Sequence, residues 1–389
     1  MTFSSTSVLH EASLKMKTPQ HIHFLVDDLR KQKTLKGVIA KESAIQRRIA
    51  SGGGTPLIEA NNAHFFFECE DSSANISVVG DWNSWKRGAD KLERIHPKST
   101  LYHLARQFPP DARLSYRFIL DNDESINDPH NERTWQEVFG NNTYFTMPIY
   151  KGTKYLDDPA PEIPRGEIIE FDARSSRGAD FARKVFIYVP EKLRRNKKYH
   201  FIYVHDGEEA MRIGKFTNVL DHLRYFEPDV PPIIAVFIPP VDRHREYLMS
   251  AQFAKWCALG LTKQVERFLG VRSEASMRCV QGASLGGLCA AYTGMLFPKA
   301  FGNIAAQSPS FWVDDRLIIR DFSQKRRLPI RFFLHTGTIH DALAETEAMR
   351  EVLLNKGYAV TYIKTQESHN WANWSVRYEE ILRWLAGER

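Results

Sequence analysis

Three patterns of hydrophobic and polar positions follow one another along the chain. Residues 1–50 are mainly polar, and the apolar residues between Pro19 and Arg30 recur at helical spacing. A Ser-Gly-Gly-Gly-Thr-Pro run that begins at Ser51 ends this pattern, because glycine and proline interrupt helices. We therefore predict an N-terminal helical segment over residues 1–56.

The second pattern consists of short β-prone runs separated by clusters of Asp, Asn, Gly and Pro. The runs cover residues 64–68, 76–79, 101–106 and 114–120. Several short strands with polar turns are typical of a β-sandwich. We predict a small early-set or Ig-like sandwich over residues 57–150, followed by a linker over residues 151–165 that is rich in Asp and Pro.

The third pattern, over residues 166–389, alternates apolar runs with segments that fit helices. The apolar runs cover residues 185–189, 201–204, 233–238, 279–282 and 330–334, and helices are expected over residues 254–268 and 288–297. Strands that alternate with helices indicate a mostly parallel sheet covered on both faces. The fold class is therefore α/β, and we place the chemistry in this region.

Composition excludes several classes of protein. Of 389 residues, 43% are hydrophobic and 26% are charged, as in ordinary globular proteins. No run approaches the roughly 20 apolar residues that span a bilayer, and residues 1–20 have no apolar core. We therefore expect a cytoplasmic protein without a membrane partner.

Charge and cysteine usage point to no further ligand. The formal net charge is +6, but the basic residues are scattered and form no nucleic-acid motif, so we expect no nucleic-acid partner. The four cysteines form no C-x-x-C pair and lie in apolar segments, which favours buried thiols over disulfides. No His and carboxylate pattern suggests a metal site. We expect neither a metal nor a cofactor, and the sequence does not indicate an oligomeric state.

The strongest chemical signal is a G-x-S-x-G motif, Gly282-Ala-Ser284-Leu-Gly286. It follows an apolar strand candidate and precedes an apolar, small-residue stretch, which is the strand–turn–helix context of a nucleophile elbow. Side chains two residues before and two residues after the serine would clash in so tight a turn, so both positions need glycine. We predict Ser284 as nucleophile, with the backbone N–H of Leu285 as one oxyanion donor.

A serine hydroxyl needs a base, and in this fold the chain order is Ser, acid, His. Three histidines follow Ser284, and only His369 lies in the last strand–helix loop, so we predict it as the base. His335 lies in an apolar strand, which favours a structural role. In the preceding loop Asp341 is our first choice for the acid and Glu345 the second; either could instead simply stabilise a helix N-terminus.

A second oxyanion donor should come from an earlier strand–helix loop. The stretch Val204-His-Asp-Gly-Glu supplies a candidate in the N–H of Gly207. An Asp-Gly pair also forms ordinary tight turns, which is the alternative interpretation.

The same residues resemble a known family. Residues 165–389 are similar to the esterase D-type α/β-hydrolases, and among them to the enterochelin (ferric enterobactin) esterases. The matching blocks are Val204-His-Asp-Gly, Arg243-His-Arg-Glu-Tyr, Gln281-Gly-Ala-Ser-Leu-Gly-Gly, Gln307-Ser-Pro-Ser-Phe-Trp312 and Ser368-His-Asn-Trp371. Upstream, Gly54-Thr-Pro-Leu, Ser115-Tyr-Arg-Phe and Asp128-Pro-His-Asn resemble blocks of the family's N-terminal domain, and Gly80-Asp-Trp-Asn-Ser-Trp resembles a turn of CBM48-like sandwiches.

The resemblance implies hydrolysis of the ester bonds of a ferric catecholate trilactone, which is an anionic siderophore. The iron would belong to this substrate and not to a site of the protein. We assign Arg243, Trp312 and Trp371, which lie in the matching blocks, to substrate binding. Arg243 could instead pair with Glu246 or another acid. The sequence departs from the family where Glu367 and Ser368 replace glycines, and the carboxylate of Glu367 would place a negative charge near the site. His130 also replaces an apolar residue of the Asp-Pro-Leu-Asn block.

Three other functions compete with a siderophore esterase. The first is a carbohydrate or acyl esterase of the esterase D type. The second is carbohydrate binding by the sandwich through Trp82 and Trp85, although these side chains could instead brace a turn or pack against the hydrolase region. The third is a non-catalytic scaffold, which intact Ser284 and His369 disfavour. A lipase is disfavoured because no extended apolar lid is present.

Overall fold

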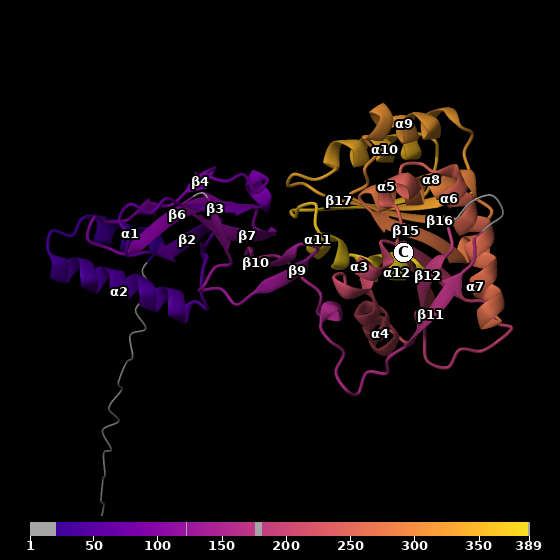
Figure 1. The fold of residues 1–389 in the computed structure, drawn as a ribbon, viewed down its shortest axis with the longest axis horizontal. Coiled ribbons are helices and arrows are strands. Elements are labelled where there is room, and N and C mark those ends of the chain that lie inside the picture. Colours follow the sequence, from indigo (N-terminus) through magenta and orange to yellow (C-terminus); the bar gives the residue numbers. More distant parts are fainter. Residues whose placement is uncertain (1–20, 122, 176–180, 388–389) are drawn as a thin grey trace, which may run out of the picture.

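A computed structural model describes residues 21–121, 123–175 and 181–387. The protein consists of two bodies lying side by side, an N-terminal β-rich body and a larger α/β body (Figure 1). Residues 1–20, in which the sequence shows no apolar core, lie outside the described residues. Within the described ranges, no helix combines the length and the apolar character needed to cross a membrane.

The N-terminal body is a sandwich of two antiparallel sheets. One sheet has the order β1-β2-β6-β5, and the other has the order β4-β3-β7-β10-β9 with β8 paired to β7. The strands are β1 Leu57–Glu59, β2 Asn62–Glu68, β3 Ile76–Gly80, β4 Asp90–Lys91, β5 Glu93–Arg94, β6 Leu101–Gln107, β7 Arg113–Leu120, β8 Glu124–Ile126, β9 Thr134–Glu137 and β10 Gly140–Thr146.

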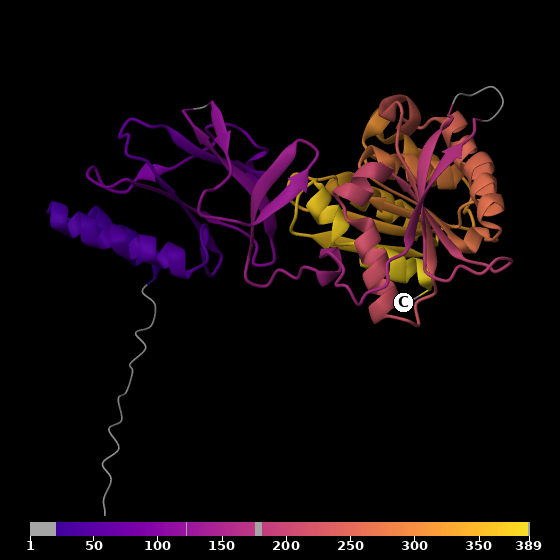
Figure 2. The same cartoon turned by 60° about the horizontal axis from the view of Figure 1, so that its bottom comes forward.

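Alternation along β2 explains how this body is layered. Phe65 and Phe67 point between the two sheets and pack with Tyr116, Phe118 and Phe145. Phe66 points the other way, into a core shared with helices α1 (Ile22–Arg30) and α2 (Leu35–Ser51). The helices lie along the outer face of the first sheet, as Figure 2 shows. The described part of the predicted helical segment, from residue 21 onward, therefore folds onto the sandwich.

The α/β body is built on one eight-stranded sheet of order β11-β12-β14-β13-β15-β16-β17-β18. Strand β12 runs antiparallel to both of its neighbours, β11 and β14. The remaining neighbours in the sheet, from β14 through β13, β15, β16 and β17 to β18, are parallel to one another. The strands are β11 Glu167–Ala173, β12 Arg183–Val189, β13 His200–His205, β14 Ile233–Ile238, β15 Arg278–Ala283, β16 Asn303–Gln307, β17 Arg331–Gly337 and β18 Val360–Thr365.

Helices cover both faces of this sheet, which confirms the predicted α/β-hydrolase class. On β13, Phe201 and Tyr203 belong to the core on one face, while Ile202 and Val204 belong to the core on the other. The helices are α3 Gly207–Arg212, α4 Phe216–Phe226, α5 Arg243–Tyr247, α6 Ala251–Lys255, α7 Thr262–Leu269, α8 Leu285–Leu296, α9 Val313–Gln324, α10 Leu343–Asn355, α11 Trp371–Ser375 and α12 Tyr378–Ala386. A π-helical stretch, Trp256–Leu261, joins α6 to α7.

The segment between the two bodies packs against the α/β body. Tyr155 and Leu156 form a 3-10 turn, Lys154–Leu156, and are buried in the core beside α4. Tyr155 also donates to Glu227 at 2.6 Å. The predicted linker is therefore held along part of its length, and Figure 1 shows α11 of the α/β body facing β9 of the sandwich.

Candidate active site

Ser284 lies on the tight turn that joins β15 to α8. Its φ of 57° and ψ of −124° are an unfavourable conformation for a residue with a side chain. A Cβ on Gly282 would come within 2.3 Å of the carbonyl oxygen of Gly286, so glycine is required there. Leu285 is the first residue of α8, a position whose N–H has no partner within the helix. The strand–turn–helix geometry inferred from the motif is present.

The structure brings His369 and Asp341 together. His369 Nδ1 lies 2.7 Å from Asp341 Oδ1, and the carboxylate also accepts from the backbone N–H groups of Gly337 and Ala342 and from the Ser308 hydroxyl at 2.6–2.7 Å. Burial opposes ionisation of Asp341, but these donors and the nearby histidine outweigh it and lower its pKa. Asp341 is therefore an ionised group aimed at the histidine ring.

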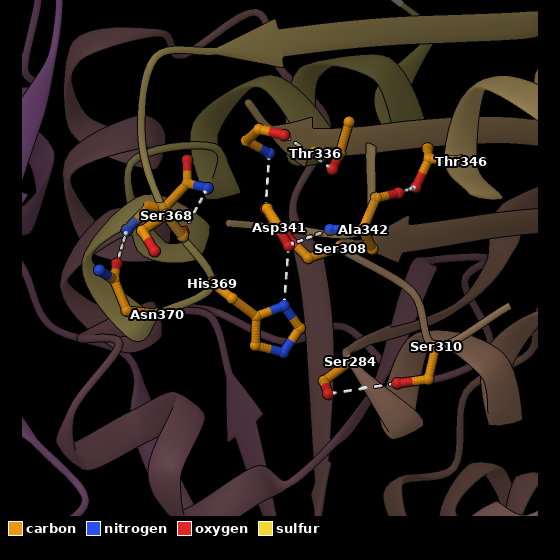
Figure 3. Close-up of polar contacts among 12 residues, drawn as sticks. Ser284, Ser308, Ser310, Thr336, Asp341, Ala342, Thr346, Ser368, His369 and Asn370 are labelled. Atoms are coloured by element: carbon orange, nitrogen blue, oxygen red, sulfur yellow. Dashed lines mark hydrogen bonds and ion pairs between the residues drawn. The ribbon is translucent and has the colours of Figure 1, made fainter. Parts of the chain in front are cut away.

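Figure 3 shows the His369 ring lying between Asp341 and Ser284, with its second nitrogen on the side of the serine. The Ser284 hydroxyl lies 3.4 Å from the Ser310 hydroxyl. The His369 ring packs edge-on against Trp374, and its side chain is 37% exposed. The ring is thus oriented by Asp341 and Trp374 and remains accessible from solvent.

The other residues weighed for the base and the acid have different partners. Glu345 forms an ion pair with Arg316 at 2.8 Å. His335 is fully buried, and burial lowers its pKa to about 3, as fits a structural residue. His340 is exposed, and its Nε2 lies 2.9 Å from the carbonyl oxygen of Trp82 in the sandwich. Of these candidates, the structure brings together Asp341 and His369.

Gly207 begins α3 and packs directly against β14. A Cβ there would lie 2.4 Å from the backbone nitrogen of Ile238, so only glycine fits. The preceding Asp206 is in the left-handed region, and its N–H donates to the Tyr247 hydroxyl at 2.9 Å. The loop lies beside the elbow, since a Cβ on Gly286 would be 3.2 Å from Asp206 Oδ2. A role of Gly207 as oxyanion donor stays a prediction.

Arg243 is paired with an acid, but not with Glu246. Its guanidinium makes two hydrogen bonds of 2.8 and 2.9 Å to Asp206, which is buried beside the elbow. Glu246 is held instead by Arg183, through two hydrogen bonds of 2.7 Å. Burial raises the pKa of Asp206 despite the opposing effect of Arg243. Much of the positive charge expected to meet a substrate is therefore neutralised.

The two tryptophans assigned to substrate binding differ in exposure. Trp312 is 58% exposed at the start of α9, two residues beyond Ser310. Trp371 is only 7% exposed and packs edge-on against Trp374 in the core. Its ring therefore packs within the base loop and presents little surface to a substrate, and its assignment to substrate binding stays a prediction.

The carboxyl of Glu367, expected to place a negative charge near the site, is buried. Its side chain is 2% exposed, and burial raises its pKa to about 7. Arg113 and Arg377 act in the opposite direction, while Asp81 and Glu380 add to the rise. The loop after β18 turns inward at this point, which a sequence pattern alone does not reveal.

The sandwich forms part of a cavity beside His369 that the sequence did not predict. The cavity has a volume of about 320 Å³ and is lined by Asp81, Ser84, Trp85, Ser115, Glu137 and Asn142 of the sandwich and by His340, Ser368, His369 and Asn370 of the α/β body. Trp82 packs inside the sandwich against Phe65 and Phe108, as one of the two interpretations expected. The Gly80-Asp-Trp-Asn-Ser-Trp block signalled the fold, but its place beside the site depends on domain docking.

Comparisons with known proteins agree with this geometry. The family described as "Putative esterase" matches residues 176–385. The iron(III) enterobactin esterase of Dickeya dadantii (strain 3937) is 28% identical over 399 residues, covering 85% of this chain and 90% of that protein. The enzyme of the same name from Escherichia coli (strain K12) is 29% identical over 213 residues, covering 52% of this chain and 50% of that protein.

Solved structures share the fold. The enterobactin esterase FES from Shigella flexneri, crystallised in the presence of enterobactin, has a TM-score of 0.68 at 20% identity, covering 83% of this chain and 92% of that chain. A ferulic acid esterase from Anaeromyces mucronatus has a TM-score of 0.51 at 16% identity, covering 61% and 96%. The resemblance drawn from the sequence blocks is confirmed. Since the family match spans more than half of the chain, the protein belongs to this esterase family and is a carboxylic ester hydrolase.

Proposed function

We propose that the protein is a serine esterase in which Ser284, His369 and Asp341 form the catalytic triad. The observation that carries the proposal is the His369 ring, held by Asp341 at 2.7 Å and lying between that carboxylate and the strained serine turn. Ser284 attacks the ester carbonyl and passes its proton to His369 Nε2. Asp341 holds the ring in the required tautomer and stabilises the imidazolium.

The tetrahedral intermediate carries a negative oxygen, which the N–H groups of Leu285 and Gly207 would stabilise. His369 then gives its proton to the leaving alcohol oxygen, and the acyl group stays on Ser284. Water attacks this acyl ester while His369 takes a proton from it. Collapse of the second intermediate releases the acid and returns the proton to Ser284.

We propose a ferric catecholate trilactone of the enterobactin type as the substrate. The support is the similarity to iron(III) enterobactin esterases over most of both chains and the exposed Trp312 near the elbow, which offers a flat surface to an aromatic ring. The four cysteines are unpaired, and three are buried, which fits a reducing, cytoplasmic compartment.

One observation favours a second candidate, a neutral acyl or carbohydrate ester. Among the described residues, the cavity beside His369 is lined by Asp81 and Glu137 and by no lysine or arginine. Arg243, the basic residue assigned to the substrate, is already paired with Asp206. An anionic ferric complex gains little attraction from such a wall.

One experiment separates the two candidates. Wild type and Ser284→Ala are incubated with ferric enterobactin, with a feruloyl sugar ester and with p-nitrophenyl acetate, and products are followed by chromatography and absorbance. Serine-dependent cleavage of the siderophore supports the first candidate. Cleavage of the feruloyl sugar ester without cleavage of ferric enterobactin supports the second candidate. A wild type that cleaves no ester contradicts the serine esterase mechanism.

A further inference from the structure

Polar contacts from the sandwich reach the residues that stand directly beside the base and the acid. Asn370, which follows His369, donates from Nδ2 to Asp81 Oδ2 at 3.1 Å. His340, which precedes Asp341, lies with Nε2 2.9 Å from the Trp82 carbonyl oxygen. Asp81 and Trp82 are neighbours in one 3-10 turn of the sandwich. We propose that this turn is a positioning element of the active site, with Asp81 setting the place of the base loop.

Asp81 is a rigid anchor. It is 4% exposed, and its carboxylate also accepts from the Ser115 backbone N–H at 2.7 Å and from Trp85 Nε1 at 3.2 Å. A buried acceptor with several donors has one low-energy placement, because moving it would leave those donors unsatisfied. Any group bonded to Asp81 is therefore fixed relative to the sandwich.

Asn370 transmits that position to the base loop. Its Oδ1 accepts from the Asn373 N–H at 3.0 Å and caps α11, while its Nδ2 reaches Asp81. Both ends of the amide are thus engaged, one in the α/β body and one in the sandwich. On the next residues, the carboxylate of Glu137 faces the backbone N–H groups of Trp371 and Ala372. The sandwich therefore places acceptors beside the first three residues that follow His369.

The acid loop is held by the same element. His340 has a φ of 48°, a conformation that a side-chain-bearing residue adopts at a cost, and its ring reaches the Trp82 carbonyl oxygen. Trp82 is itself fixed by packing against Phe65 and Phe108 and by a 2.6 Å hydrogen bond to Asp90. One turn of the sandwich therefore fixes both loops whose relative placement determines the His369–Asp341 contact.

This inference rests on the proposed triad. A positioning role and a substrate-binding role of the sandwich predict different losses of activity with small and large esters. A displacement of about 1 Å at a catalytic group costs on the order of 100-fold in rate. If the sandwich positions the base, the loss must appear with an ester too small to touch the sandwich. If the sandwich only binds substrate, the loss must be confined to large substrates.

The test uses the full chain and the variant Asn370→Asp. This change keeps the oxygen that caps α11, removes the donor and places a second carboxylate against Asp81. Asn141→Asp, on an exposed position of β10, is the matched control for the added charge. Asp81→Asn is the conservative partner, because its amide oxygen can still accept from Asn370, and the double variant Asp81→Asn with Asn370→Asp removes the repulsion.

We expect Asn370→Asp to lower kcat for p-nitrophenyl acetate about 10- to 100-fold. Its KM should stay within about twofold of the wild-type value, and its unfolding temperature should stay within a few degrees of that of wild type. The rate at which a fluorophosphonate labels Ser284 should fall by a similar factor. Asp81→Asn alone should lose less than about fivefold, and the double variant should recover at least about fivefold over Asn370→Asp, since it removes the repulsion between two carboxylates.

Three results would overturn the inference: a loss confined to the large substrate, an equal loss in Asn141→Asp, or strictly additive effects in the double variant. A wild type that cleaves the small ester but not ferric enterobactin would reject the proposed substrate alone. The small ester and the fluorophosphonate would still report on the position of the base in that case.

Discussion

Glu367 offers a direct test of how the interface between the two bodies contributes to stability. Its carboxyl is 2% exposed, and within the described part of the chain its Oε2 meets no hydrogen-bond donor. Burial raises its pKa from 4.5 to about 7, with Asp81 and Glu380 contributing in the same direction and Arg113 and Arg377 opposing. We propose the change Glu367→Gln, which keeps the shape of the protonated acid and cannot ionise.

The sign of the effect follows from the direction of the pKa change. Glu367 binds its proton more tightly in the folded protein than in the unfolded chain. Its favourable contribution is fully present below about pH 4.5 and is lost as the pH rises through about 7. The difference corresponds to about 3 kcal/mol, at about 1.4 kcal/mol for each pH unit, and relaxation of the site makes this an upper bound. Glu367→Gln should therefore be more stable than wild type by about 1–3 kcal/mol above pH 8 and similar to it near pH 5.

Urea unfolding followed by tryptophan fluorescence at pH 5, 6, 7 and 8.5 measures this difference. Glu351→Gln, at an exposed position of α10, is the control for loss of a carboxylate and should show no pH-dependent gain. The reasoning is refuted if the stability difference between Glu367→Gln and wild type stays constant from pH 5 to 8.5. It is also refuted if the variant is the less stable protein above pH 8.

Three further predictions concern the site itself. Asp341→Asn should lower kcat about 10³- to 10⁴-fold in steady-state assays, because the histidine loses its tautomer-setting partner, while Glu345→Gln should stay within about twofold; equal losses would contradict the choice of acid. Trp312→Ala should raise KM for an aromatic trilactone several-fold and leave kcat for p-nitrophenyl acetate unchanged, and an unchanged KM would remove Trp312 from substrate binding. Arg243→Ala leaves the buried Asp206 unpaired and should destabilise the protein by about 1–3 kcal/mol at pH 8 in urea unfolding; an unchanged midpoint would show that the pair contributes nothing.

The sequence predicted those parts of the site that depend on local geometry. The turn at Ser284 is encoded in five consecutive residues, because glycine is needed where Gly282 and Gly286 approach each other. His369 followed from chain order, since each parallel strand delivers its loop to the same edge of the sheet. The same reasoning could not separate Asp341 from Glu345, because the direction in which each carboxylate points depends on the loop conformation.

The features that the sequence did not reveal concern the loop after β18 and the face of the sandwich beside it. Trp371 lies in a block that matched the family, and Glu367 looked like a charge near the substrate, but both side chains are buried. Asp81 and Glu137 were not predicted as part of the site, although both line its cavity. These features depend on how two separately folded bodies dock, and no periodicity within either body encodes that.

The interface between the two bodies is polar because its acceptors place the loop of Asn370, and not because they stabilise the docking of the bodies. The carboxyls of buried Asp81, half-buried Glu137 and buried Glu367 have pKa values raised by desolvation to about 6, 7 and 7, so each ionised group costs folding energy near neutral pH. Apolar side chains of similar size would dock the two bodies at lower cost. They would not direct a hydrogen bond at Asn370, however, since apolar contacts tolerate sliding whereas a donor–acceptor pair fixes distance and direction. An interface that holds a catalytic base therefore gains from acceptors that an interface serving only adhesion would avoid.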